Sequence, residues 1–195
     1  MSTKKDGIMI ILSSPSGAGK TTIVKLISKN KNFHISVSHT TRKPRPNEVE
    51  GVDYFFVTKK EFEKKKEKNE FYEQAKIFDN YYGTSKKSVT NILEKKNDIL
   101  FDIDWQGTQQ LSKFSELNLV KIFILPPNKK ELEIRLLQRN QDNKEIVTKR
   151  LDSFDNDVTH WKEYDYIVIN DNLENCFKQI ENIINISKKK KIELG

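Results

Sequence analysis

The feature that most constrains this chain is a glycine-containing loop between an apolar, strand-like segment and a helix-like segment. Residues 8–12 (IMIIL) run directly into residues 13–22 (SSPSGAGKTT), and a helical pattern follows. The backbone N–H groups of Gly17 and Gly19 can turn inward as a nest for phosphate oxygens, and the helix N-terminus adds positive charge. A strand, loop and helix in this order predict a phosphate-binding loop at the carboxyl edge of a parallel sheet.

The end of this loop supplies the side chains that a nucleoside triphosphate needs. Lys20 brings a mobile positive charge to the β- and γ-phosphates, and the Thr21 hydroxyl is placed to bind Mg²⁺. The strict pattern has glycine six residues before the lysine, whereas this chain has Ser14. A glycine-rich turn formed by chance is the alternative, and the flanking strand and helix argue against it. We expect the triphosphate to be bound by Ser14, Pro15, Ser16, Gly17, Ala18, Gly19, Lys20, Thr21 and Thr22.

Short apolar runs alternate with charged, helix-period segments along the rest of the chain. This alternation is typical of an α/β domain with a mostly parallel sheet. The length of 195 residues favours one such domain, since a domain takes roughly 150 residues. We therefore expect a P-loop NTPase-type parallel sheet flanked by helices, with strands at 8–12, 34–38, 54–57, 71–77, 99–103, 120–125 and 166–169.

The expected helix starts share one pattern, a capping side chain three residues before a glutamate. In Thr58…Glu61 the first side chain can accept from orphan backbone N–H groups while the glutamate reaches back. The same spacing recurs at Asn128…Glu131, Asp142…Glu145 and Asp171…Glu174. We expect helices at 59–69, 129–139, 143–160 and 172–187, and two more after Gly19 and Thr84.

One stretch breaks the alternation. Residues 39–53 read HTTRKPRPNEVEGVD and have no apolar periodicity. Pro44 and Pro46 lock extended backbone and push their preceding residues away from helix. Strand signals then cluster in 54–57 and 71–82. This pattern predicts a partly antiparallel, mixed-strand subdomain inserted in the parallel core.

Composition excludes several classes of protein. A single cysteine, Cys176, excludes an internal disulfide framework and a four-cysteine zinc site. The longest apolar run, 8–12, is far shorter than the roughly 20 residues of a membrane span, so we expect a cytoplasmic protein. The net charge of +7 fits an anionic partner. Much of the excess lies in 59–68, which reads as a solvated helix face, and in 188–191, which we expect to be a frayed tail.

The proline-stiffened stretch carries a candidate site for a second phosphate group. Arg42 and Arg45 offer two guanidinium forks, and Ser38 and Tyr54 add hydroxyl donors. Such a set can hold a phosphate monoester dianion through paired hydrogen bonds. The alternative is a solvated basic loop steadied by carboxylates such as Glu48.

Glu73 lies in a strand otherwise rich in aromatic residues, and Tyr82-Gly83-Thr84 follow a tight turn. A carboxylate can accept two donors in a fork, and guanine offers such a pair in its N1–H and 2-amino groups. Adenine has an unprotonated N1 that repels a carboxylate. The Thr84 hydroxyl could donate to the guanine carbonyl. The alternative for Glu73 is an outward-facing strand residue.

Asp102 and Asp104 close the apolar strand 99–103. Residues two apart on a strand share a face, so both carboxylates are expected at the carboxyl end of the sheet, where ligands bind in open α/β folds. One of them can hold Mg²⁺ or its water. The alternative is a helix-capping aspartate, because Gln106 and Gly107 follow.

Three arginines could neutralise the charge of a phosphoryl group during its transfer. Arg135 and Arg139 are four apart on an expected helix and therefore share a face, and Arg150 comes from the next helix. The alternative is that they pair with neighbouring carboxylates such as Glu131 and Glu133.

Taken together, seven segments of this sequence resemble the guanylate kinase family. They occur in the family order and cover residues 8–171: SSPSGAGKTT, SVSHTTRKPRPNEVEGVDYFF, FYEQA, NYYGTS, LFDIDWQG, IFILPP and YIVIND. The resemblance implies transfer of the ATP γ-phosphoryl group to GMP, and to dGMP, with Mg²⁺ as cofactor and no nucleic acid or membrane partner. A monomer and a homodimer both remain open. The implied domain at 6–187 has a core of 6–38, 90–127 and 156–187, a GMP-binding subdomain at about 39–89 and a helical lid at about 128–155, before a basic tail at 188–195.

The resemblance also implies roles for single residues. The GMP phosphate would be held by Ser38, Arg42, Arg45, Tyr54 and Tyr82. The guanine base would be recognised by Glu73, Thr84 and Asp104. Asp102 would lie near the reacting phosphates. Catalysis is implied for Lys20, Arg42, Asp102, Arg135, Arg139 and Arg150, the ATP side for Asn170, and Mg²⁺ for Thr21 and Asp102.

Three other functions compete with this interpretation. A catalytically silent scaffolding module is the first, and such modules have degraded phosphate loops or acceptor sites, whereas Lys20, Arg42 and Glu73 are all present. An RNA-binding ATPase would suit the charge, but the chain has no RNA-module signature. A P-loop kinase for another mononucleotide is the third, and Glu73 discriminates against it.

Overall fold

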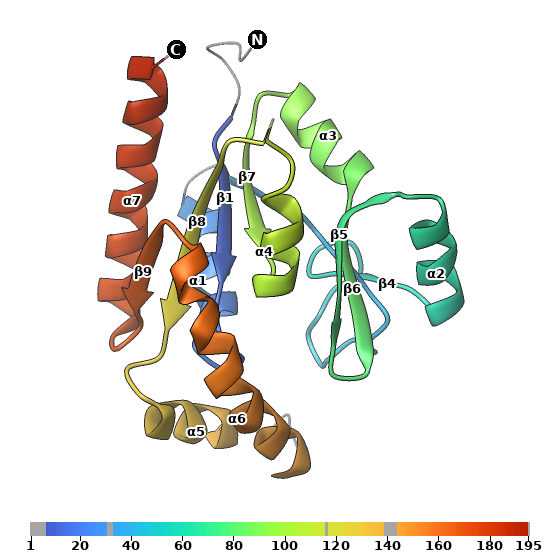
Figure 1. The fold of residues 1–195 in the computed structure, drawn as a ribbon, viewed down its shortest axis with the longest axis vertical. Helices are drawn as coiled ribbons and strands as arrows, with labels where there is room; N and C mark the ends of the chain where they lie inside the picture. The colour runs from blue at the N-terminus through green and yellow to red at the C-terminus, as the bar shows by residue number, and fades with distance from the viewer. Residues whose placement is uncertain (1–6, 31–32, 116, 139–143, 195) are drawn as a thin grey trace.

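A five-stranded parallel sheet forms the centre of the protein (Figure 1). The computed structural model describes residues 7–30, 33–115, 117–138 and 144–194. The strand order is β2-β7-β1-β8-β9, and β1 in the middle is buried along its whole length. Such burial on both faces explains why its sequence is a continuous apolar run rather than an alternating one. The strands are β1 (Met9–Ser13), β2 (Phe33–Ile35), β7 (Asp98–Asp102), β8 (Leu119–Leu125) and β9 (Tyr166–Ile169).

Helices cover both faces of this sheet. On one face, α1 (Lys20–Asn30) and α7 (Leu173–Leu194) pack on the strands through residues such as Ile27 and Ile180. On the other face, α3 (Lys86–Glu94) and α4 (Trp105–Leu111) contribute Val89 and Leu111. No helix in the described ranges is both long and apolar enough to cross a membrane.

A second sheet lies beside the first, in the order β4-β3-β6-β5. Its strand β3 pairs parallel with β4 and antiparallel with β6, so the sheet is mixed as expected. Helix α2 (Lys59–Glu67) covers it through Phe62, whose ring stacks on Phe71 at a centroid distance of 4.7 Å. The strands are β3 (His39–Thr40), β4 (Phe55–Phe56), β5 (Phe71–Ile77) and β6 (Asn80–Ser85).

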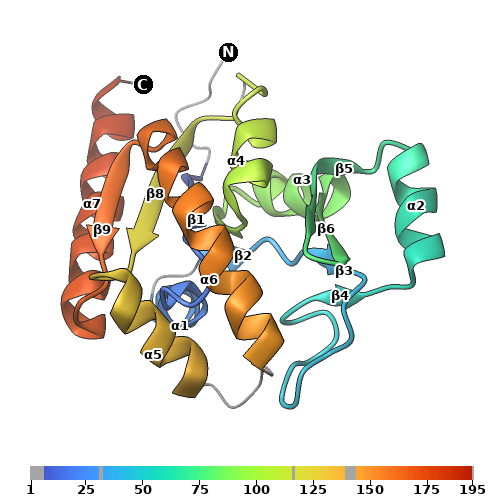
Figure 2. The same ribbon diagram turned by 60° about the horizontal axis from the view of Figure 1, so that its bottom comes forward.

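Two further helices form a small layer at the carboxyl edge of the large sheet. Helices α5 (Lys129–Gln138) and α6 (Lys144–Thr159) pack together through Leu132, Leu136 and Val147, and a short 3₁₀ helix, η1 (His160–Glu163), leads from α6 towards β9. Figure 2 shows α6 running between the phosphate-loop side of the molecule and the small sheet.

The expected fold class is confirmed, and several local predictions need correction. The strand expected at 34–38 is the shorter β2, because only Phe33–Ile35 pairs with β7. The short strand β3 was not expected, and helix α4 was expected only in the alternative interpretation of Asp104 as a helix cap. The cap of α7 is Asn172, whose Oδ1 accepts from the N–H groups of Glu174 and Asn175, and not Asp171.

The basic C-terminal segment is not frayed. Helix α7 continues to Leu194, and Lys188 donates to Asp98 Oδ2 and lies 4.9 Å above the ring of Phe33. Asp98 Oδ1 also accepts from the N–H of Ile8. One carboxylate therefore joins the ends of β1, β7 and α7.

Candidate functional site

A cavity of about 720 Å³ opens between the phosphate loop, the small sheet and α6. It is lined by residues from most of the regions that the sequence singled out. The predicted residues that line it are Ser14, Pro15, Ser16, Gly17, Gly19, Lys20, Thr21, Ser38, Arg42, Arg45, Tyr54, Glu73, Tyr82, Asp102, Asp104 and Arg150. Predicted residues that do not line it are Ala18, Thr22, Thr84, Arg135 and Asn170, and Arg139 lies outside the described residues.

The loop between β1 and α1 has the backbone that a phosphate nest requires. Gly17 and Gly19 have φ values of 96° and 97°, which side-chain-bearing residues rarely adopt. A Cβ on Gly19 would lie 2.4 Å from Asn170 Nδ2, which donates to Ala18 O at 2.8 Å and so supports the loop from behind. Ser14 has no positive φ, and its hydroxyl donates to Pro15 O at 2.9 Å. The missing glycine at this position is therefore tolerated.

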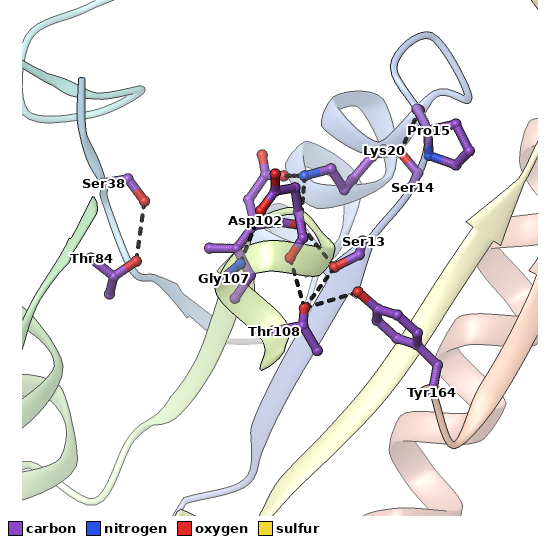
Figure 3. A network of polar contacts seen from close by, with 12 residues as sticks. Ser13, Ser14, Pro15, Lys20, Ser38, Thr84, Asp102, Gly107, Thr108 and Tyr164 are labelled. Carbon is purple, nitrogen blue, oxygen red and sulfur yellow. Dashed lines mark hydrogen bonds and ion pairs between the residues drawn. The ribbon is translucent and has the colours of Figure 1, made fainter. Parts of the chain in front are cut away.

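Lys20 is paired with a carboxylate across the cavity floor. Its Nζ forms an ion pair with Asp102 Oδ1 and donates to Ile103 O at 3.2 Å (Figure 3). The pairing is possible because β1 and β7 are neighbours and Leu12 is in register with Asp102. Asp102 is the last residue of β7, at the carboxyl end of the strand. Asp104 was expected on the same strand face, but the alternative is the one observed: it is the N-cap of α4 and accepts from Gly107 N at 3.0 Å.

A buried hydroxyl network lies beneath this floor. Ser13 Oγ donates to Ile103 O at 2.8 Å and lies 3.0 Å from Thr108 Oγ1, which accepts from Tyr164 OH at 2.9 Å (Figure 3). Thr108 Oγ1 in turn donates to Asp104 O at 2.9 Å. The network joins the start of the phosphate loop, the start of α4 and the segment before β9. Sequence reasoning missed it, because its members are up to 151 positions apart.

Glu73 is the most deeply buried carboxylate of the cavity, with 2% of its surface exposed. Burial raises its pKa to about 7, against the lowering effect of hydrogen bonds with Thr84. Its Oε1 has no hydrogen-bond partner among the described residues. Ser38 Oγ lies 3.3 Å from Thr84 Oγ1 beside it (Figure 3). Glu73 also lines the cavity, and an unpaired buried acceptor at its wall is suited to a ligand that brings its own N–H donors.

Arg42 is held by a glutamate from its own loop. Its Nη2 donates to Glu48 Oε1 at 2.8 Å, and Glu48 Oε2 accepts from the N–H of Arg45 at 2.7 Å. Burial opposes ionisation of Glu48, but the Arg42 and Arg45 bonds keep its pKa below the usual value. Arg42 also lies 5.4 Å from the ring centre of Tyr54. The alternative of a solvated basic loop assigned Glu48 only to steadying the loop. In the structure, Glu48 also holds the Arg42 guanidinium, which lines the cavity.

The other arginines differ in their placement. Arg150 is buried, and its Nη1 donates to Ser16 Oγ in the phosphate loop at 2.6 Å. Arg135 pairs instead with Glu131 at 2.9 Å, as the alternative interpretation had it, and donates to Asn170 O at 3.0 Å.

Helix α6 is also attached to α4 by contacts that the sequence did not suggest. Trp105 Nε1 donates to Asp157 Oδ1 at 3.1 Å, and the Trp105 ring stacks on His160 at a centroid distance of 3.7 Å. Burial raises the pKa of Asp157.

Comparisons with known proteins agree on one family. The family model described as guanylate kinase matches residues 7–187. A guanylate kinase of Rickettsia bellii is 51% identical over 190 residues, covering 97% of this chain and 99% of that protein. One of Novosphingobium aromaticivorans is 50% identical over 179 residues, covering 91% and 81%. The crystal structure of guanylate kinase from Anaplasma phagocytophilum superposes with a TM-score of 0.79 at 33% identity, covering 94% and 87% of the two chains.

Proposed function

The chain belongs to the guanylate kinase family and is therefore an ATP-dependent kinase that phosphorylates GMP to GDP, and we propose how its own residues divide this work. The observation that carries the proposal is that two cationic sites face one cavity. The phosphate loop with Lys20 lies on one side, and Arg42 and Arg45 lie on the other. A donor and an acceptor phosphate held this way would meet between them.

The donor side binds the ATP phosphates. Gly17 and Gly19 turn backbone N–H groups towards the β-phosphate, and Lys20 leaves Asp102 to contact the β- and γ-phosphates. The ATP phosphates replace the Asp102 carboxylate as the anionic partner, so the Lys20 charge is paired before and after ATP binds. Asn170 acts on this side indirectly, because it supports the loop through Ala18 O.

The acceptor side binds GMP. Arg42, Arg45, Ser38, Tyr54 and Tyr82 hold its phosphate, with the guanidinium of Arg42 fixed by the loop carboxylate described above. Paired guanidinium–phosphate hydrogen bonds also fix the direction of the acceptor oxygen.

Glu73 reads the guanine base with help from Thr84 and Asp104. Its unpaired Oε1 and deep burial support this role, because guanine supplies N–H donors and Oε1 has none among the described residues. No residue assigned here reads the ribose 2′-hydroxyl, so dGMP is proposed as a second acceptor.

Magnesium would be held by the Thr21 hydroxyl and, through a water, by Asp102. The residues present fit this ion, because both side chains line the cavity and offer the oxygen ligands that Mg²⁺ prefers. When bound with ATP, the ion neutralises charge on the phosphates.

The chemistry needs no strong protein base, because the acceptor oxygen of GMP is already anionic. Catalysis would rest on in-line positioning, on neutralisation of charge by Lys20, Arg42 and Arg150, and on exclusion of water. Arg135 would join them only by leaving Glu131, and Arg139 stays a prediction. Arg150 is already in contact with the phosphate loop.

We also propose a division into three parts, with a core, a GMP-binding subdomain at about 39–89 and a lid at about 128–155. The separate small sheet and the α5–α6 pair support these boundaries. Both parts would close over the bound nucleotides, since an open site hydrolyses ATP. The cytoplasm, where ATP and GMP occur, is the proposed location.

A coupled assay of ADP release tests the proposal directly. The purified protein with ATP and Mg²⁺ is offered GMP, dGMP, AMP, dTMP, UMP or no acceptor. We expect rapid ADP release with GMP and dGMP and a background rate with the others. Release of ADP without any acceptor at the GMP rate would indicate an ATPase, and absence of release with GMP would indicate a silent module.

A further inference from the structure

The outer edge of β5 is covered by a side chain rather than by a strand. β5 is the last strand of the small sheet, so one side of its backbone has no strand partner in the part of the chain that the structure describes. Gln110 of α4 fills part of this edge: the N–H of Gln74 donates to Gln110 Oε1 at 3.0 Å, and Gln110 Nε2 donates to Gln74 O at 2.7 Å. The amide thus makes the same reciprocal pair of hydrogen bonds that a neighbouring residue in a sheet would make.

The rest of this helix face continues the contact. Gln106, one turn before Gln110, directs its Nε2 towards Lys76 O at 3.5 Å, the next carbonyl on the same edge of β5. Between the two glutamines, Gly107 lies against the Glu73 carboxylate. The helix therefore contacts both the backbone of β5 and its buried acid.

Helix α4 is itself fixed to the donor side. It starts three residues after the last residue of β7, and Thr108 contacts Ser13 through the buried hydroxyl network. Gln110 is consequently the side chain with the two shorter hydrogen bonds by which a helix packed on the large sheet holds the strand that carries Glu73.

We propose that Gln110 is a positioning residue for base selection. By hydrogen-bonding both backbone groups of Gln74, it fixes the position and orientation of the neighbouring Glu73. The inference rests on the proposed role of Glu73 in reading guanine. Gln110 itself does not line the cavity that holds the substrates. It acts on the geometry of the acceptor base and leaves the phosphate loop unaffected.

The test replaces the amide by a side chain of similar shape without hydrogen-bonding groups, Gln110→Met. Steady-state kinetics are measured with GMP and with IMP, which lacks the 2-amino group, and the ATP dependence is measured at saturating GMP. We expect the KM for GMP to rise about tenfold, because a hydrogen-bonded position of Glu73 is lost. The preference for GMP over IMP should fall about fivefold, and the KM for ATP should stay within about twofold.

The matched control is Gln109→Met, since Gln109 lies on the same helix but is exposed and donates to Glu163 instead. This variant should keep the parent values. Hydrogen exchange of the Gln74 amide gives a readout that does not depend on activity, and it should be faster in Gln110→Met than in the parent or in Gln109→Met.

Two results would overturn the inference. One is an equal rise of the KM for GMP and for ATP, which indicates general loosening. The other is an unchanged GMP-to-IMP preference while the Gln74 amide exchanges faster. If Gln110→Met fails to fold, Gln110→Glu, which retains the size and the acceptor oxygen but removes the donor, is measured by the same criteria. A parent protein without GMP activity contradicts the proposed function itself, whereas an active parent with an unaffected variant contradicts only the role of Gln110.

Discussion

The carboxylate of Glu73 lies directly against the backbone of Gly107. A Cβ added to Gly107 would stand 2.7 Å from Glu73 Oε2, 3.1 Å from its Cδ and 3.3 Å from the Cβ of Ile103. Gly107 is a buried helical position without a positive φ, so its lack of a side chain is explained by this contact and not by backbone conformation. The acid can occupy its place only because the helix leaves room for it.

Gly107→Ala should therefore separate stability from substrate use. Alanine favours a helix interior over glycine by up to about 1 kcal/mol, which offsets part of the overpacking cost, so we expect the melting temperature to change little. The added methyl group displaces the Glu73 carboxylate, and kcat/KM for GMP should fall about tenfold or more while the KM for ATP is retained. Calorimetry and steady-state kinetics check the two halves. Gln109→Ala, on the exposed side of the same helix, should leave both unchanged.

The raised pKa of Glu73 predicts two opposite pH effects. In the role proposed for Glu73, guanine binding needs the carboxylate, so the KM for GMP should rise as the pH falls below about 7. Stability runs the other way: the folded protein binds a proton that the unfolded chain releases, so this contribution is present at low pH and is lost as the pH rises through the folded pKa. The loss is at most on the order of 3 kcal/mol, from the span between the usual value and about 7.

Glu73→Gln tests this assignment, because it removes the titration. Without nucleotide, the variant should melt higher than the parent at pH 8 and show a smaller difference near pH 5. Its KM for GMP should be high at all pH values. A parent and variant with parallel melting curves across this range would assign the pH dependence to other groups.

Glu48→Gln should weaken the acceptor phosphate site without changing base selection. The substitution removes the charge that Arg42 Nη2 and the Arg45 N–H share. We expect the KM for GMP and for IMP to rise together, by about tenfold, so that their ratio is retained. Glu50→Gln is the matched control, since Glu50 lies in the same loop but accepts from the Phe56 N–H. A change in the GMP-to-IMP ratio for Glu48→Gln would contradict the separation of phosphate and base sites.

The hydroxyl network under the cavity floor should act mainly on stability. Tyr164→Phe removes the donor to Thr108 Oγ1 and should cost about 1–2 kcal/mol, measured by urea unfolding. Thr108→Val should cost more, because Tyr164 then loses its acceptor and Asp104 O loses one of its two donors and keeps only the backbone N–H of residue 108. The reverse order of the two variants would show that Thr108 is not the centre of the network.

Features with a local cause were predictable from the sequence. The phosphate loop depends on residues next to each other, the capping box of Thr58 and Glu61 closes over three positions, and the strand at Phe71–Ile77 matches its apolar pattern. Arg135 has an equally local alternative in Glu131, one helical turn away, and in this structure that pairing is the one formed.

Features that depend on distant partners were not predictable in this way. The two residues of β3 form a strand because β6 and β4 pair with them, not because of any apolar alternation. Helix α4 is rich in glutamine and contains Gly107, so its periodicity is weak, and Asp104 was placed on the preceding strand. The contacts of Gln110 with Gln74 and of Tyr164 with Thr108 span 36 and 56 positions.

The segment that forms the small sheet is inserted between two neighbouring strands of the large sheet, and this position has an evolutionary consequence. The polypeptide leaves the large sheet after β2 and returns at β7, and these two strands are direct neighbours. The excursion therefore begins and ends at one edge of the scaffold, and altering its interior breaks no pairing between other strands of the large sheet. Selection can remodel which monophosphate is accepted while the machinery that handles the triphosphate is inherited unchanged.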